Sequence, residues 1–160
     1  NSGRSRVAME TPNFIALEPY AARSPFETHI LPKRHQSHYE DIDDAAIPEL
    51  AGILRKSLQK IERALNNPSY NYLIHTGPLN VGPMGQYHWH FEIIPRISRV
   101  AGFEWGTGFF INPVTPENAA QYLRDIRLLR SRKSPPRFSR SRSPAAWRTP
   151  GSPISWTRKR

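Results

Sequence analysis

Apolar and polar residues alternate along several short stretches of this chain, which is the pattern of half-buried β-strands. Alternating runs, most of them ended by a proline, predict strands at residues 13–18, 27–31, 70–75 and 86–94. Residues 76–85 are rich in glycine and proline, which favour turns. The last two strands are therefore predicted to pair as neighbours across this loop.

A helical period of apolar side chains runs from Ile47 to Leu65, with charged and amide side chains on the opposite face. Asp43 or Asp44 can cap its start, and the Asn-Asn-Pro of residues 66–68 ends it. A second helix is predicted to begin near residues 115–117, where a threonine cap precedes a proline in the first turn. Together these elements predict an α+β domain in which the long helix packs on a sheet.

The chain is long enough for one domain with a hydrophobic core and too short for two ordinary ones. It has no cysteine, which excludes a disulfide scaffold and a cysteine-type zinc site. No apolar run approaches the roughly 18 residues of a membrane span, and residues 1–6 do not form a signal peptide. We therefore expect a soluble, cytoplasmic protein with no membrane partner. The start at Asn-Ser-Gly without an initiator methionine suggests a fragment.

The formal net charge of +10 belongs to one end of the chain. Residues 126–160 hold 11 of the 23 Lys and Arg and none of the 13 Asp and Glu, so residues 1–125 have 12 basic and 13 acidic side chains. We expect a folded domain over 1–125 and a mostly disordered tail, rich in Arg, Ser and Pro, over 126–160. The tail is either a nucleic-acid-binding arm or a solvated extension, a cloning artefact or out-of-frame translation. The second group of explanations is favoured, so nucleic acid is not an expected partner.

The segment 86–94 combines histidine with aromatic residues in alternation. In a strand, His88, His90 and Glu92 point to one face over about 13 Å, at roughly 3.3 Å per residue, and the apolar residues between them point to the core. Two histidines two positions apart can share a metal ion, and His75 on the adjacent strand could supply a third nitrogen. The alternative is that these histidines merely line a polar face of the sheet.

Two arginines, Arg96 and Arg99, follow this strand. A guanidinium group suits phosphate or another anion because it offers several hydrogen-bond donors in one plane. Either residue could equally be a solvated surface charge, and both interpretations stay open.

Four segments of the chain carry a family likeness in one order: residues 25–35 (PFETHILPKRH), 74–78 (IHTGP), 88–96 (HWHFEIIPR) and 102–109 (GFEWGTGF). They resemble the second half of bacterial galactose-1-phosphate uridylyltransferases, members of the histidine-triad superfamily, and the likeness covers about residues 6–125. It implies a histidine-triad-like antiparallel sheet with flanking helices. It also implies a homodimer whose subunit contains two such halves, with the N-terminal half missing here.

The family transfers a uridylyl group from UDP-glucose to galactose 1-phosphate through a covalent uridylyl-histidine, as part of galactose metabolism. The nucleophile is the second histidine of a His-Pro-His motif in the first half, and this chain has no His-Pro-His. His90 stands where the superfamily nucleophile stands, but Glu92 replaces the third histidine of the usual triad. The resemblance therefore implies part of a nucleotidyltransferase that lacks the catalytic nucleophile.

The resemblance also implies a zinc or iron site whose ligands in this chain are His75, His88 and His90. In the family a glutamate from the first half is the fourth ligand. Here water or Glu92 would have to take its place.

The segment 104–109 is implied to be a loop that reaches across the dimer to the sugar phosphate in the partner subunit. The residues expected to bind substrate are Glu104, Trp105, Thr107, Gly108 and Phe109. Glycines would let backbone amides approach a phosphate. The alternative is a turn packed by its two aromatic side chains. The remaining histidines are expected to be structural or surface residues, and these are His29, His35 and His38.

Three functions follow, in order of preference. The first is the C-terminal portion of a uridylyltransferase, which supplies a structural metal site and part of a shared active site. The second is an independent nucleotide hydrolase or nucleotidyltransferase that uses His90 as its nucleophile. The third is an RNA-binding protein that acts through the basic tail.

Overall fold

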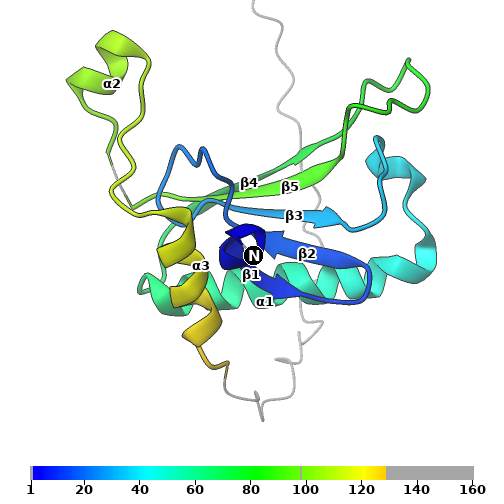
Figure 1. The fold of residues 1–160 in the computed structure, drawn as a ribbon, viewed down its shortest axis with the longest axis horizontal. Coiled ribbons are helices and arrows are strands. Elements are labelled where there is room, and N and C mark those ends of the chain that lie inside the picture. The colour runs from blue at the N-terminus through cyan, green and yellow to red at the C-terminus, as the bar shows by residue number, and fades with distance from the viewer. Residues whose placement is uncertain (1, 98, 129–160) are drawn as a thin grey trace, which may run out of the picture. The chain divides into compact units, whose positions relative to one another are not determined.

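Five β-strands form one antiparallel sheet in the computed structural model, which describes residues 2–97 and 99–128 (Figure 1). The strands are β1 (Val7–Glu10), β2 (Phe14–Leu17), β3 (Thr28–Pro32), β4 (Tyr70–His75) and β5 (His90–Pro95). Their order across the sheet is β1-β2-β3-β5-β4, and every neighbouring pair is antiparallel. The expected α+β fold with an antiparallel sheet is confirmed.

Three α-helices accompany the sheet in the described part of the chain: α1 (Ile47–Ala64), α2 (Gly102–Thr107) and α3 (Pro116–Asp125). Short 3-10 turns cover Ser2–Arg6, Tyr39–Asp41 and Asp44–Ala46. The predicted long helix is confirmed. Asp43, however, caps the 3-10 turn that precedes it, by accepting a hydrogen bond from the backbone N–H of Ala45 at 3.0 Å.

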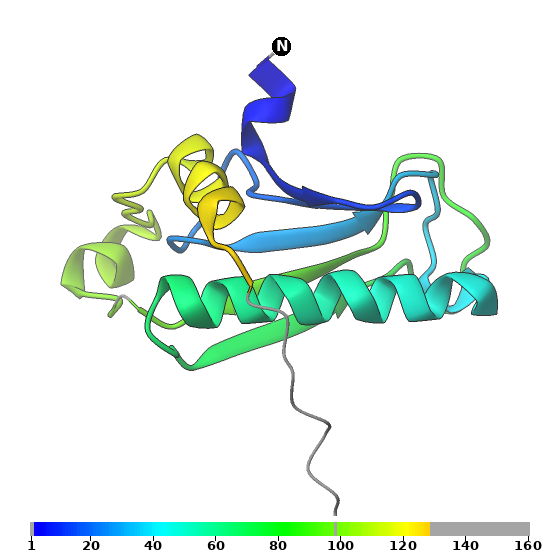
Figure 2. The same cartoon turned by 90° about the horizontal axis from the view of Figure 1, so that it is seen from below.

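The helix α1 lies along one face of the sheet, as Figure 2 shows, and buries an apolar stripe there. Leu50, Ile53 and Ile61 recur at helical spacing and belong to one core with Phe14 and Trp89. The Trp89 side chain is fully buried, and its ring centroid lies 6.3 Å from that of Phe14. Burial of this stripe removes the apolar face of the helix from water and fixes α1 on the sheet.

The helix α3 extends the same core beside β1. Thr115 caps it as predicted, by accepting a hydrogen bond from the backbone N–H of Asn118 at 3.3 Å. Leu123 is buried, and its carbonyl accepts a hydrogen bond from Lys60 Nζ of α1 at 2.6 Å. Arg124 donates to the carbonyl of Ser5 at 3.0 Å, just before β1. These contacts join the end of the described domain to its beginning.

The two edges of the sheet differ. The edge strand β1 has a bulge between Val7 and Met9 and packs against α3. It was not predicted from the sequence, because its four residues bury one side chain and so show no alternating apolar run. The opposite edge strand, β4, exposes Tyr72, Leu73 and Ile74, and no described strand pairs with its outer side.

The predicted strand over residues 86–94 is wrong at its start, because β5 begins at His90. The partner strand β4 ends at His75, which lies directly opposite His90, so earlier residues have no partner in the ladder. Trp89 instead donates its backbone N–H to the carbonyl of Gln36 at 3.0 Å. The alternation of burial continues nonetheless, since Trp89 is buried and His88 is half-buried.

The predicted loop over residues 104–109 is also wrong, because most of it lies in α2. The carboxylate of Glu104 accepts a hydrogen bond from the backbone N–H of Ala101 at 2.9 Å, and Gly108 ends the helix with φ of 73°. The alternative of a packed turn does not hold either, since Trp105 is 81% and Phe109 is 72% exposed. Figure 1 shows α2 projecting away from the sheet.

No helix within the described ranges is long and apolar enough to cross a bilayer. The predicted disordered tail lies, from residue 129 onward, outside the described residues. The domain boundary placed after residue 125 stays a prediction.

Candidate functional site

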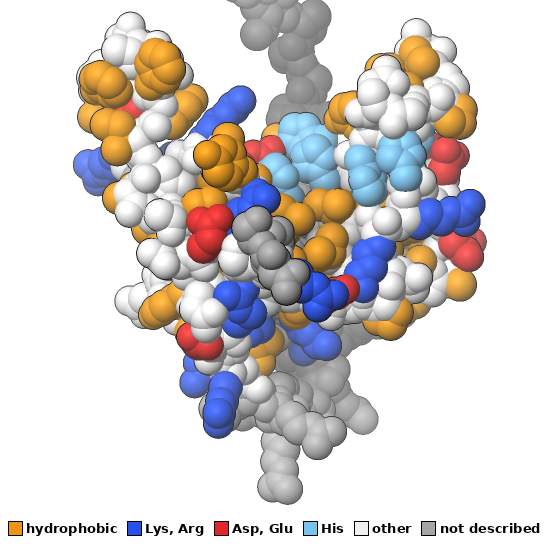
Figure 3. Space-filling model, viewed as in Figure 1, with side chains coloured by type: hydrophobic (Ala, Val, Ile, Leu, Met, Phe, Trp, Pro, Cys, Tyr) orange, Lys and Arg blue, Asp and Glu red, His pale blue; other side chains and the backbone are white. Residues whose placement is uncertain are grey.

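Pairing of β3, β4 and β5 brings distant histidines together on the face of the sheet opposite α1. His29 of β3 lies directly opposite Glu92 of β5, and His75 of β4 lies opposite His90. Because side chains alternate along a strand, these residues share the face away from the core. Figure 3 shows histidine side chains gathered on one face of the molecule. Two of the three predicted metal ligands, His75 and His90, are thus neighbours.

The imidazole of His90 lies between two others. Its ring is stacked against His29 and against His75, with 4.9 Å between centroids and 21° between planes in both pairs. Its Nδ1 lies 3.1 Å from the carbonyl of His88, and because a carbonyl can only accept, Nδ1 carries a proton. Burial lowers the pKa of His90, and the neighbouring His29 and His75 lower it further. In the neutral ring the lone pair is therefore on Nε2, which is available to a metal or an electrophile.

Glu92 joins this cluster through His75. Its Oε2 lies 2.6 Å from Nε2 of His75, which is a short, charge-assisted contact when the imidazole is protonated. The His75 side chain is 40% exposed and that of Glu92 is 17% exposed. A carboxylate in this position fixes the orientation of the His75 ring.

Glu27 is the most deeply buried acidic side chain of the cluster, with 4% of its surface exposed. Its Oε2 accepts backbone hydrogen bonds from Arg23 at 2.8 Å and Ser24 at 3.2 Å, and its Oε1 lies 3.3 Å from Nε2 of His29. Burial raises the pKa of Glu27, but the hydrogen bonds from His29 and from the two backbone amides outweigh it and lower the pKa below its ordinary value. The carboxylate is therefore ionised near neutral pH.

These donors fit a divalent metal ion. One ligand atom each from Glu27, His29 and Glu92 lies within 4.8 Å of the other two. Imidazole and carboxylate are the usual ligands of zinc and of non-haem iron. The cluster is therefore a candidate metal-binding site.

His88 contacts a histidine outside the group formed by His29, His75 and His90. Its ring lies against His35, with 5.2 Å between centroids and 53° between planes. Burial lowers the pKa of His88, and the neighbouring His35 lowers it further. Its Nε2 is buried and has no hydrogen-bond partner among the described residues. A buried imidazole nitrogen without a partner is suited to a metal, so the predicted role of His88 stays open.

His29 was predicted to be a structural or surface residue, but it lies within the cluster. The signal that could have revealed it is the spacing of Glu27 and His29, two positions apart at the start of a strand. That spacing gains meaning only from the pairing of β3 with β5, which joins residues 63 positions apart in the register His29 to Glu92.

Ser37 and His38 hold the connection between β4 and β5. Ser37 Oγ lies 2.7 Å from His38 Nδ1 and accepts a hydrogen bond from Met84 N–H at 3.0 Å. His38 Nε2 lies 3.2 Å from the carbonyl of Pro78, so it carries the proton and Nδ1 accepts from Ser37. Gly77 packs directly against this ring. The prediction that His38 is structural is confirmed.

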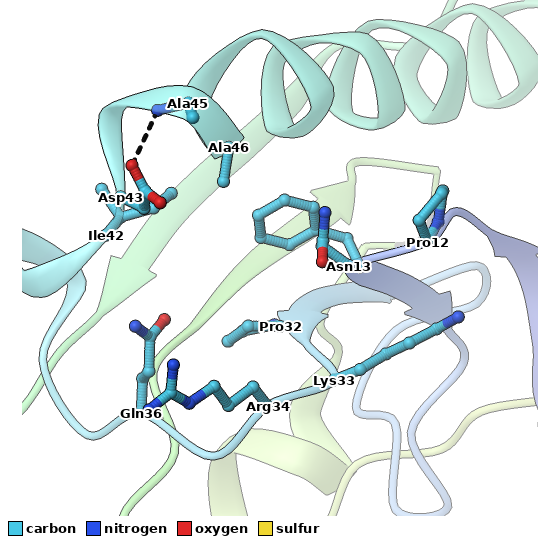
Figure 4. Close-up of a pocket in the computed structure, with 11 residues that line it drawn as sticks. Pro12, Asn13, Pro32, Lys33, Arg34, Gln36, Ile42, Asp43, Ala45 and Ala46 are labelled. Atoms are coloured by element: carbon cyan, nitrogen blue, oxygen red, sulfur yellow. Dashed lines mark hydrogen bonds between the residues drawn. The ribbon is translucent and has the colours of Figure 1, made fainter.

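A hollow of about 500 Å³ also lies at the beginning of α1 (Figure 4). Two of its polar residues are already paired: Lys33 Nζ lies 2.6 Å from a carboxylate oxygen of Glu10, and Asn13 donates to Glu49. Figure 4 shows the Asp43 side chain turned toward the backbone of Ala45. The hollow thus presents few free polar groups to a ligand.

A second hollow, of about 530 Å³, brings together the two arginines that follow β5 and part of α2. Arg96 and Arg99 line it with Arg23, whose guanidinium carbon lies 5.6 Å from the centre of the Phe110 ring. Glu104 and Trp105, two of the predicted substrate-binding residues, line it as well. Three arginines against one glutamate give the lining a net positive charge, so the hollow is electropositive.

The other predicted substrate-binding residues end or follow α2. Thr107 Oγ1 donates to the carbonyl of Phe103 at 2.7 Å and accepts a hydrogen bond from the backbone N–H of Phe109 at 3.2 Å. Gly108 adopts the left-handed conformation that lets the chain leave the helix. The substrate-binding role of this set stays a prediction.

A family model described as the C-terminal domain of galactose-1-phosphate uridyl transferase matches residues 2–133. The chain therefore belongs to this family, as the four sequence segments indicated. A histidine-triad-like protein from Bartonella henselae is similar in fold, with a TM-score of 0.54 at 19% identity over 74% of this chain and 83% of that one. At this identity the likeness concerns the fold alone, and it supports the histidine-triad-like architecture.

Two curated relatives are similar over most of the chain. ADP-glucose phosphorylase from Arabidopsis thaliana is 46% identical over 124 residues, covering 76% of this chain and 35% of that protein. Its crystal structure with bound ADP-glucose has a TM-score of 0.73 at 44% identity, over 79% of this chain and 42% of that one. Galactose-1-phosphate uridylyltransferase from Thermotoga maritima is 34% identical over 133 residues, covering 78% and 42%. This chain thus spans less than half the length of these relatives.

Proposed function

We propose that this chain is the C-terminal portion of a nucleotidyltransferase whose substrates are a nucleotide sugar and a hexose phosphate, with UDP-glucose and galactose 1-phosphate as the first candidates. It supplies a structural zinc or iron site and part of an active site that two subunits of a homodimer share. The observation that carries the proposal is the imidazole and carboxylate cluster on the open face of the sheet, in a chain of this family.

The metal is proposed to bind at His75, His88 and His90, as the sequence suggested. Two of these rings are stacked, and the third presents a buried nitrogen without a partner. A metal ion bound here would cross-link β4 to the start of β5. The fourth position would be taken by water or by a carboxylate.

The electropositive hollow supports a role in binding the sugar phosphate. Arg23 is distant in sequence from Arg96 and Arg99, and all three line the same space as Asn71. Guanidinium groups bind phosphate oxygens in pairs of parallel hydrogen bonds, and an amide can donate to a sugar hydroxyl. Glu104 and Trp105 stand at the same hollow, where a sugar ring could be oriented.

The identity of the nucleotide has a second candidate. The relative from Arabidopsis thaliana, at 46% identity, is an ADP-glucose phosphorylase, whereas the uridylyltransferase from Thermotoga maritima is 34% identical. This difference favours ADP-glucose as an alternative to UDP-glucose. Both candidates share a nucleotidyl transfer reaction and a sugar phosphate.

An independent nucleotide hydrolase or transferase with His90 as its nucleophile is the alternative enzyme. It is favoured by one observation: the hydrogen bond from Nδ1 to the carbonyl of His88 leaves the lone pair of His90 on Nε2. Attack on a nucleotide would form a phosphoramidate bond at that nitrogen and release the leaving group with its bonding electrons. Glu92, instead of a third histidine, speaks against this assignment.

Titration calorimetry on the full chain tests the two enzymes against each other. We expect galactose 1-phosphate to bind saturably, and its affinity to fall at least about tenfold in an Arg96→Gln/Arg99→Gln variant. Arg55→Gln, on the exposed surface of α1, is the matched control and is expected to bind like wild type.

Covalent labelling completes this test. With UDP-glucose or ADP-glucose labelled in the nucleotidyl phosphate, the proposed function predicts no acid-labile label on the protein, because the chain has no His-Pro-His. Label that appears on wild type and disappears in His90→Gln would establish the alternative enzyme. Failure to bind any sugar phosphate would argue against the proposed role of the hollow.

A further inference from the structure

We propose that Glu27, His29 and Glu92 form a divalent-cation site with two carboxylates and one imidazole, different in its ligands from the His75, His88 and His90 set. The cation it suits is zinc or iron(II), or manganese(II) as a harder alternative. The proposal rests on the geometry of this cluster and is independent of which nucleotide sugar the family member uses.

The site stands on adjacent strands, which hold its ligands in place. His29 and Glu92 face each other across the β3–β5 pair, and Glu27 lies two residues before His29. Phe26, just before Glu27, has φ of 61°, so the backbone turns sharply before it enters β3. The β3–β5 pairing and the turn at Phe26 thus position the three side chains, whose ligand atoms lie within 4.8 Å of one another.

Glu27 is held so that one oxygen remains for a ligand. Oε2 is bound by the backbone amides of Arg23 and Ser24, while Oε1 faces His29 at 3.3 Å, which is long for a charge-assisted hydrogen bond. The side chain is 4% exposed. The two backbone amides and His29 compensate the buried charge of Glu27, and a cation bound at Oε1 would replace the long contact with His29.

The other two ligands are oriented by histidines next to them. Oε2 of Glu92 is bound by His75 at 2.6 Å, and the ring of His29 is stacked on His90 at 4.9 Å. Hydrogen bonds to a ligating carboxylate commonly tune metal affinity about 10- to 100-fold. In this arrangement His75 and His90 position the ligands, and His88, which lies against His35, takes no part.

The ligand chemistry limits the cation. Two carboxylates and one imidazole suit zinc, iron(II) and manganese(II) better than copper(I), which prefers sulfur, or calcium, which prefers six to eight oxygens. Three protein ligands leave at least one position to water or to an oxygen of a bound molecule, which is the arrangement of open zinc sites.

Cobalt(II) absorption and elemental analysis on the full chain test the site. The protein is stripped of metal and titrated with cobalt(II), whose visible bands report binding, and with zinc as competitor. His29→Phe keeps a ring against His90 but removes the nitrogen. Glu27→Gln and Glu92→Gln keep the shape and remove the charge. Each is expected to weaken cobalt(II) binding by at least about tenfold.

Glu117→Gln, which removes a carboxylate from the surface of α3, is the matched control and is expected to bind cobalt(II) like wild type. His88→Phe removes a ligand of the other proposed set only, so it is expected to keep the cobalt(II) ion that Glu27, His29 and Glu92 hold. Circular dichroism of the metal-free variants establishes that each is folded before its affinity is compared.

The outcomes separate the two ligand sets. Loss of a cobalt(II) ion in His29→Phe, Glu27→Gln and Glu92→Gln that is still bound in His88→Phe supports the proposed site. Loss in His88→Phe with wild-type binding in His29→Phe and Glu27→Gln overturns it and assigns the metal to His75, His88 and His90. Binding of two metal ions per chain, one of which is lost when each ligand set is substituted, also supports the proposed site. Folded wild type that binds no zinc, cobalt(II) or manganese(II) overturns it. None of these results depends on sugar phosphate binding. A failure of the proposed function can therefore be distinguished from a failure of this metal site.

Discussion

The segment from Trp89 to Ile93 has two faces that are stabilised in different ways. Trp89, Phe91 and Ile93 are buried with the apolar stripe of α1. His90 and Glu92, which alternate with them, are half-buried and are held by ring stacking and a hydrogen bond. Removal of apolar surface from water contributes several kcal/mol at such positions, whereas a hydrogen bond contributes about 1 kcal/mol net. One alternation of residues therefore places the core on one face and the candidate binding residues on the other.

The largest expected effect is on the core face. Trp89→Ala should lower the free energy of unfolding by about 3 to 5 kcal/mol, because it leaves a cavity against Phe14 and Tyr39. Urea denaturation followed by circular dichroism measures the change. The next residue, His90, points to the opposite face, and His90→Ala should lower the free energy of unfolding by about 1 kcal/mol or less. Equal losses in the two variants would contradict the assignment of the faces.

A buried carboxyl outside the cluster is expected to give the next largest effect. Glu18 is 1% exposed, and burial raises its pKa to about 8. Its Oε1 lies 2.8 Å from Oγ1 of Thr28, and this hydroxyl also lies 3.2 Å from the carbonyl of Phe26. The hydrogen bond that Thr28 donates to Glu18 lowers the pKa of this carboxyl, but the effect of burial is larger.

This carboxyl makes the stability of the domain depend on pH. An unfolded chain releases the proton near the ordinary pKa of 4.5, but the folded chain keeps it until about pH 8, so the folded state binds more protons between these values. The free energy of unfolding should therefore fall as pH rises through this window. Glu18→Gln should flatten the decline and stabilise the protein at pH 7 by roughly 1 to 3 kcal/mol. Urea denaturation at several pH values checks this, and a slope unchanged by the substitution would contradict it.

The loop between β4 and β5 packs so closely at Gly77 that one added methyl group should destabilise the protein. A Cβ at residue 77 would lie 2.8 Å from Nε2 of His38 and 3.1 Å from the carbonyl of Ser37, so Gly77→Ala should cost about 1 to 2 kcal/mol. Thermal unfolding measures it, with Gly52→Ala, where a Cβ meets nothing within 4 Å, as the control. In a double-mutant cycle, His38→Ala should cost less in the Gly77→Ala background than alone.

The smallest expected effect is on the polar face itself. In metal-free protein, Glu92→Gln should change the free energy of unfolding by less than about 1 kcal/mol, because its partner His75 is partly exposed. Chemical denaturation in the presence of a chelator measures this. A loss as large as that of Trp89→Ala would mean that the two faces do not divide folding from binding.

Much of the fold could be predicted from the sequence because several helix and strand signals depend only on residues that are close together in the chain. The apolar period from residue 47 and the Thr115 cap act within a few residues, and both elements form where they were predicted. The start of β5 could not be read in this way, because it depends on where its partner β4 ends. The helix α2 could not be predicted because it contains Gly102 and Gly106, which are unfavourable in helices. In its first turn, the carboxylate of Glu104 accepts a hydrogen bond from the backbone.

The candidate site shows the same division. The alternation around His90 indicated which side chains share a face, and the pairing of β4 with β5 was foreseen, so His75 was placed next to His90. The contribution of His29 could not be foreseen, because it depends on the register between strands that are distant in sequence. The contact of His88 with His35 could not be foreseen either, since His88 precedes the first residue of β5.

The unequal edges of the sheet also affect how this chain can be handled in solution. At β1 a bulge and α3 restrict access, but the outer side of β4 pairs with no strand in the described part of the chain and the strand exposes Tyr72, Leu73 and Ile74. Such an edge can pair with the same edge of another molecule, which is a common route to aggregation. Protein concentration is therefore an experimental variable, and sedimentation at several concentrations belongs beside every binding curve. A charged residue in place of Leu73 would be the first change to make if the chain precipitates.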